Sequence, residues 1–224
     1  PELIFQSNST IEQFSQELRF SGETADLNWV GGLYYLSIDT DYSQGLAGSP
    51  TTFFLGGEEN NTLVSLETDS YSLFGQVDYS LTDDLVLVGG LRYTREDKAF
   101  VGNVYQNENT NDRIIEIDTS TASLEVMDEQ NDQNLWSAKL QLEYSVGNSL
   151  YYAGINRGVK AGSFNAPLLG GFSFYEPEEL TSYEAGLKHS FMQGSGVFNA
   201  NVFYYDYSDY QSFSWVNNAG VVTN

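Results

Sequence analysis

Apolar and polar side chains alternate along several segments of the chain. In segment 71–79 the odd-numbered positions are apolar or glycine, and the even-numbered positions are mostly polar. Segment 136–144 shows the same alternation without a break, with its apolar side chains at even-numbered positions. A period of two places successive side chains on opposite faces of a β-strand. The same pattern predicts strands at 14–20 and 182–191.

Four further segments between these strands are rich in Leu, Val, Tyr and Gly but alternate less regularly. They lie at 27–38, 85–98, 150–160 and 197–207. Leu, Val and Tyr are residue types that favour strands. We therefore expect an all-β protein of about eight strands.

The connections between these strands are alternately short and long. The short links are 21–26, 81–84, 146–149 and 192–196, and the long ones are 39–69, 99–134 and 161–179. A strict alternation of this kind is typical of an antiparallel up-and-down transmembrane β-barrel, with short periplasmic turns and long extracellular loops. The expected fold is a segment of such a barrel.

Aromatic residues mark both ends of the apolar face on three strands. They stand eight positions apart, which at about 3.3 Å per residue and a tilt of about 40° spans roughly 20 Å, close to the apolar band of a membrane barrel. A sandwich core would place its aromatic residues in the middle of the strands. The pairs are Tyr71 with Tyr79, Trp136 with Tyr144, and Tyr183 with Phe191.

The opposite face of these strands carries charges of both signs, which a water-filled or plug-filled interior accommodates and a dry core does not. The same charges would also suit the solvent face of an open sheet. They are Arg19, Asp78, Lys139, Glu143, Glu184 and Lys188.

The composition excludes several classes of function. Nine basic and 31 acidic residues give a net charge of −22, which repels phosphates and argues against nucleic-acid binding. The absence of Cys excludes disulfides and thiolate metal sites, and His189 has no second histidine for a zinc pair. Neither a catalytic constellation nor a cofactor motif is found, so we expect no enzyme and no cofactor.

Most acidic residues fall in the long connections, where clustered carboxylates suggest calcium. The spacing matches no EF-hand loop, and a solvated acidic rim accounts for the charge better than a calcium site does. We therefore predict no metal site. The residues concerned are Asp39, Asp41, Glu58, Glu59, Asp128, Glu129 and Asp132.

Four stretches resemble TonB-dependent receptors of the bacterial outer membrane. Segment 89–96 reads GGLRYTRE, segment 156–165 reads NRGVKAGSFN, and segment 175–188 reads YEPEELTSYEAGLK. Segment 203–207, FYYDY, is also similar to a strand of that family. The third stretch is the most specific of the four.

The resemblance implies a 22-stranded barrel plugged by an N-terminal domain, embedded in outer-membrane lipid and energised by the TonB system. It also implies uptake of a scarce nutrient, most often a ferric siderophore or a similar iron complex. No plug domain and no terminal aromatic strand are recognisable, so residues 1–224 are expected to be an internal part of the barrel domain. The alternative is a soluble or surface-attached β-sheet module that binds carbohydrate or protein.

In the resembled family, ligands bind on the extracellular side. Aromatic loop residues are therefore candidates for ligand binding, together with two basic residues at the strand rim. Neighbouring loops could cover the aromatic side chains instead, and the basic pair could neutralise nearby glutamates. The candidates are Tyr42, Phe53, Phe54, Phe172, Phe174 and Tyr175, with Arg157 and Lys160.

Overall fold

The computed structural model describes residues 3–48, 58–108, 118–168, 170–216 and 219–224, and these form strands and one short 3-10 helix. The all-β prediction is confirmed. Within the described residues, no helix has the length and apolar character needed to cross a membrane. The elements are β1 (Leu3–Glu23), β2 (Leu27–Gly48), β3 (Glu58–Ser80), β4 (Leu85–Glu108), β5 (Glu125–Val146), β6 (Ser149–Lys160), β7 (Ser163–Asn165), β8 (Ser173–Tyr175), β9 (Glu178–Phe191), the 3-10 helix η1 (Met192–Gly194), β10 (Gly196–Ser208), β11 (Ser212–Val216) and β12 (Ala219–Thr223).

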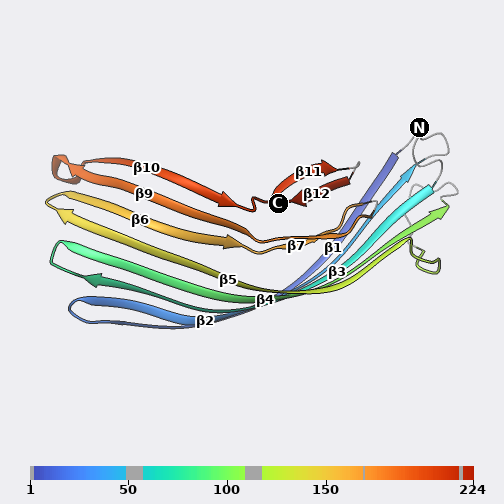
Figure 1. Ribbon diagram of the computed structural model, residues 1–224, viewed down its shortest axis with the longest axis horizontal. Helices are drawn as coiled ribbons and strands as arrows, with labels where there is room; N and C mark the ends of the chain where they lie inside the picture. Colours follow the sequence, from blue (N-terminus) through green and yellow to red (C-terminus); the bar gives the residue numbers. More distant parts are fainter. Residues whose placement is uncertain (1–2, 49–57, 109–117, 169, 217–218) are drawn as a thin grey trace.

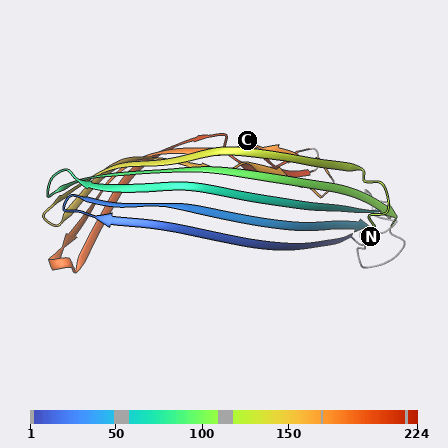
Figure 2. The same cartoon turned by 90° about the horizontal axis from the view of Figure 1, so that it is seen from below.

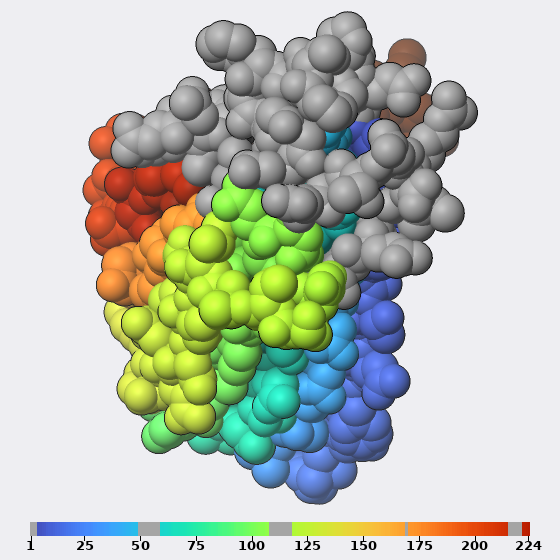
Figure 3. All heavy atoms as spheres, turned by 90° about the vertical axis from the view of Figure 1, so that its right-hand side faces the viewer, coloured from blue at the N-terminus to red at the C-terminus, as the bar shows by residue number. Residues whose placement is uncertain are grey.

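Eight of these strands form one antiparallel sheet in the order β1-β2-β3-β4-β5-β6-β9-β10 (Figure 1). They are the eight strands that the sequence predicts. Seen from below, the sheet is a single curved layer (Figure 2). Its two edge strands, β1 and β10, lie on opposite sides of the molecule (Figure 3) and do not pair with each other. The sheet is therefore an open, barrel-like wall.

The four short connections gather at one end of the sheet, as predicted (Figure 1, left). We call this end the turn end and the opposite end the loop end. The link between β5 and β6 is a tight turn in which Gly147 has a φ of 57°, a conformation that glycine adopts without strain.

The strands differ in length at the loop end. Strands β1 to β5 have 21 to 24 residues, whereas β6, β9 and β10 have 12 to 14. A tilted strand crosses a bilayer in about 9–11 residues, so β1 to β5 extend well beyond that thickness. We call the five long strands the tall wall and the other three the low wall.

This extension corrects the expected loop boundaries. Residues 39–48 and 58–69, predicted as loop, continue β2 and β3, and residues 99–108 and 125–134 belong to β4 and β5. The alternation fades there because neither face of the extended strands needs to be apolar. Most residues of the expected acidic loops therefore lie on strands.

The two faces of the sheet carry different side chains. The face of Tyr71, which we call the outer face, exposes apolar residues to the surroundings. Every outer residue that the alternation predicts is found there, and no second sheet covers them among the described elements. These residues are Tyr71, Leu73, Val77, Trp136, Leu140, Leu142, Tyr183 and Leu187.

The buried core lies on the other face, which we call the inner face. Val64 of β3 and Phe100 of β4 pack there against Phe164 of the short β7–β8 hairpin. Phe100 is only 1% exposed. The chain between β6 and β9 thus folds back over the inner face of the tall wall.

Candidate functional site

Two rows of aromatic side chains cross the outer face, one near each end of the apolar band. Leucine side chains fill the space between the rows, and Leu73 and Leu140 are 61% and 52% exposed. An apolar band between aromatic rows is the surface that a barrel presents to a lipid bilayer. The row near the loop end contains Tyr35, Tyr71, Tyr93, Trp136 and Tyr183, and the row near the turn end contains Trp29, Tyr79, Tyr144, Tyr151 and Phe191.

Arg157 lies on the outer face beside the row near the loop end. Its register partners are Ala138 and Thr181, and its guanidinium carbon lies 3.8 Å from the centre of the Trp136 ring. It also pairs with Glu179 and donates a hydrogen bond to the Trp136 carbonyl oxygen. These contacts place Arg157 at the membrane boundary, apart from the other predicted ligand residues.

Three predicted ligand residues do come together on the inner face. Tyr42, Phe172 and Phe174 all pack around the buried core. The Phe100 ring stacks on Phe164 with centroids 4.7 Å apart, and Phe172 meets Phe100 edge-on at 5.5 Å. The chain between β6 and β9, which carries Phe172 and Phe174, therefore packs on the wall and covers Tyr42 in part. Cover by a neighbouring loop is the alternative that the sequence left open.

Tyr42 is the polar member of this cluster. Its hydroxyl donates a hydrogen bond to Gln44 Oε1, and burial raises the pKa of the phenol above its usual value. The ring thus offers a neutral hydrogen-bonding group over the whole physiological pH range.

Amide side chains hold the β7–β8 hairpin and the β11–β12 hairpin in place. Each amide donates to and accepts from one backbone peptide group, as a neighbouring strand would. Gln133 Nε2 donates to the Gly162 carbonyl oxygen over 3.1 Å, and Gln133 Oε1 accepts from the Gly162 N–H over 2.7 Å. Asn165 makes the same two-point contact with the backbone of Val222, at 2.8 and 2.7 Å. Nothing in the sequence pattern predicts these contacts, because an amide side chain has no characteristic spacing to a distant peptide group.

A carboxylate fixes the end of the loop that precedes β8. The two oxygens of Glu125 accept hydrogen bonds from the backbone N–H groups of Gly171 and Phe172, at 2.8 and 3.0 Å. Together with the Gln133 contacts, these two hydrogen bonds hold residues 161–168 and 170–176 on the inner face of the tall wall.

The remaining predicted residues are more dispersed. Lys160 is the last residue of β6, lies at an inner register position and is exposed. Tyr175 is half-buried, and its ring stacks near Phe174 with centroids 6.5 Å apart. Phe53 and Phe54 lie outside the described residues.

The inner face below the loop end is polar, as the alternation predicts. Arg19 pairs with Glu17. The Glu184 carboxylate accepts hydrogen bonds from the Tyr152 hydroxyl at 3.1 Å and the Asn201 amide at 3.0 Å. Such a surface suits water or a polar domain.

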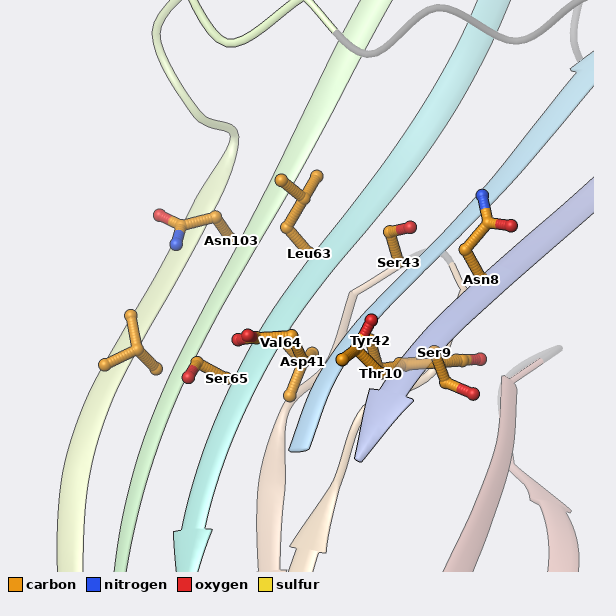
Figure 4. Close-up of a pocket in the computed structure, with 11 residues that line it drawn as sticks. Asn8, Ser9, Thr10, Asp41, Tyr42, Ser43, Leu63, Val64, Ser65 and Asn103 are labelled. Carbon is orange, nitrogen blue, oxygen red and sulfur yellow. The ribbon is translucent and has the colours of Figure 1, made fainter. Parts of the chain in front are cut away.

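A shallow hollow of about 420 Å³ lies among the loop-end parts of β1 to β4 (Figure 4). Seven of its eleven lining residues carry a hydroxyl or amide group, and the other four are Asp41, Leu63, Val64 and Val101. Asp41 and Leu63 occupy outer register positions, so this hollow opens on the outer face. Tyr42 and Val64 contribute both to its lining and to the cluster on the inner face. Among the described residues, no group of three or more acidic or histidine side chains could hold a metal ion.

Comparison with known proteins gives a consistent result. The family model described as "TonB dependent receptor-like, beta-barrel" matches residues 3–224. The ferric yersiniabactin uptake receptor of Yersinia pestis superposes with a TM-score of 0.77 at 17% identity, over 93% of this chain and 30% of that one. The alcaligin outer-membrane receptor of Bordetella pertussis gives 0.57 at 15% identity, over 98% and 34%. The chain thus spans about a third of the length of these two structures.

Proposed function

Because the chain belongs to the family of TonB-dependent receptor-like β-barrels, we propose that it is part of a receptor that imports a scarce nutrient across the bacterial outer membrane. The protein is an outer-membrane protein, and its family is one of receptors and transporters rather than enzymes. The observation that carries the proposal is the two-faced sheet. Its outer face suits lipid, and its inner face is polar and holds an ordered hairpin at the loop end.

Residues 1–224 are, in this proposal, an internal segment of the barrel domain. The backbone edges of β1 and β10 then pair with further strands of the same receptor, and a plug domain fills the interior. Coupling to the TonB system takes place through that plug. An open wall of eight strands with an apolar outer face supports this arrangement and does not suit a soluble binding module.

We further propose that the nutrient is a ferric siderophore or a similar iron complex. The titles of two matched structures name ferric yersiniabactin and alcaligin as the ligands of those receptors. In this chain the proposed contacts lie at the inner loop end, where residues 161–168 and 170–176 form a surface over the tall wall. Among the described residues they are Tyr42, Lys160, Phe172, Phe174 and Tyr175, and Arg157 is omitted because it lies on the outer face. Phe53 and Phe54 stay candidates from the sequence and lie outside the described residues.

Uptake of radioactive iron tests this function directly. Cells that lack the full-length receptor are expected to lose uptake of one ferric chelate from a panel of siderophores, and the same loss is expected when TonB is absent. Unchanged uptake of every chelate would refute the iron proposal. Uptake that continues without TonB would refute the proposed coupling.

Lys160 and Arg157 provide a matched pair of variants within this assay. Lys160→Ala is expected to weaken binding of an anionic chelate by up to about fivefold, the size of an exposed charge contact. Arg157→Ala should leave binding unchanged because its guanidinium faces the membrane boundary. Equal losses of affinity in the two variants would contradict this assignment of faces.

A further inference from the structure

Arg92 is an inner-face residue of β4 for which the proposed function has no role. It belongs to the segment GGLRYTRE, and its register partners are Phe74 of β3 and Ser137 of β5. The next residue, Tyr93, belongs to the outer aromatic row near the loop end. The Arg92 side chain therefore lies in the barrel interior at the level of the membrane boundary.

Neutral groups hold the guanidinium of Arg92 in place. Its Nε donates to Thr94 Oγ1 over 3.3 Å, and its Nη2 donates to Ser72 Oγ over 2.9 Å. The two hydroxyl oxygens are 2.8 Å apart and share a hydrogen bond. The guanidinium carbon also lies 5.3 Å from the centre of the Tyr34 ring and 5.9 Å from that of Phe74. These contacts orient the positive charge but do not neutralise it.

The lack of a counter-charge distinguishes Arg92 from the other arginines that the structure describes. Each of those pairs with a carboxylate, but Arg92 has no ion pair among the described residues. Acidic residues outnumber basic ones by 31 to nine in this chain, so an acidic neighbour would be easy to supply. A half-buried guanidinium stays charged and is costly to leave without an anion. The paired residues are Arg19 with Glu17, Arg95 with Asp97, and Arg157 with Glu179.

We propose that Arg92 is an anion-binding site of the barrel interior and that it takes a carboxylate group. A guanidinium has five N–H donors, and the two hydroxyls use two of them, which leaves three for a planar carboxylate in a bidentate geometry. The carboxylate can come from a side chain of the receptor beyond residues 1–224 or from a carboxylate-bearing ligand. The first source rests on the proposal that residues 1–224 are an internal segment of the receptor, and the second rests on the proposed uptake function.

Thermal unfolding of the full-length receptor, with and without citrate as a free carboxylate probe, tests this site. The variants are Arg92→Gln and Arg92→Lys, and the control is Arg19→Gln, an inner-face arginine that already has a partner. If the receptor supplies the carboxylate, Arg92→Gln lowers the midpoint by at least about 2 °C without citrate, and citrate has no effect. If a ligand supplies it, the midpoint without citrate is unchanged, and citrate raises the midpoint of the wild type but not of Arg92→Gln.

Arg92→Lys keeps the charge but loses the bidentate geometry, so its midpoint without citrate and its response to citrate should lie between those of the wild type and Arg92→Gln. If Arg92→Gln does not fold, Arg92→Lys alone provides the test. The proposal is overturned if both Arg92 variants match Arg19→Gln with and without citrate. Because the assay uses no transported nutrient, this outcome is distinct from a failure of the iron-uptake experiment.

Discussion

Replacing Phe100 with alanine is expected to release the β7–β8 hairpin from the inner face of the wall. The Phe100 ring is buried between Phe164 and Phe172, both from the segment that forms this hairpin. Removing a buried phenylalanine ring costs about 3–5 kcal/mol, and both ring contacts of Phe100 are with that segment. Hydrogen exchange of the Gly162 and Phe172 amides in the full-length receptor should accelerate by about a hundredfold or more.

Val101→Ala is the matched control for Phe100→Ala. Val101 is the next residue of β4, but it lies on the outer face and is 40% exposed. Its truncation should leave hydrogen exchange in segment 161–176 unchanged. Similar exchange in the Phe100→Ala receptor and the wild type would show that the hairpin does not depend on this aromatic core.

Replacing Leu140 with arginine is expected to destabilise the barrel in a bilayer by about 2–4 kcal/mol. Leu140 lies midway between Trp136 and Tyr144 on the outer face of β5 and is 52% exposed. An arginine there must place its charge at the centre of the apolar band. Urea titration of the full-length receptor in lipid vesicles measures the loss.

The control for this substitution is Gln141→Arg, one residue further along β5. Gln141 lies on the inner face, where its amide donates to Glu143 Oε1 at 2.5 Å. An arginine at this position gains a carboxylate neighbour and should cost less than about 1 kcal/mol. Equal destabilisation by the two substitutions would contradict the assignment of the lipid face.

The sequence predicts the membrane part of the fold well because two different solvents act on it. Along 71–79, lipid on one side and a polar interior on the other impose a period of two, and the structure has that alternation. Beyond Tyr35 in β2 this constraint ends, and the residues that follow, such as Asp39, Asp41 and Tyr42, show no apolar–polar alternation that would predict a strand. The strand continues there through backbone pairing with β3, which no single-strand pattern reveals.

The candidate site was less accessible to prediction. The aromatic character of Tyr42, Phe172 and Phe174 indicates that something covers these rings, and the structure shows that each contributes to the same cluster. Phe100 was missed because it stands in a segment expected to be a loop. The sequence did not show which face of β6 Arg157 occupies, because segment 150–160 alternates only weakly; the strand register places it on the outer face.

Cysteine scanning of residues 71–79 tests the central claim that the outer face of this sheet meets lipid. Single cysteines in a full-length receptor without other cysteines would carry spin labels, and their collision rates with oxygen and with a water-soluble nickel complex would be measured in vesicles. Oxygen collisions should be highest at the odd-numbered positions, and nickel collisions should be lower there than at the even-numbered ones. Equal oxygen accessibility at both sets of positions, or a maximum at the even-numbered ones, would contradict the account.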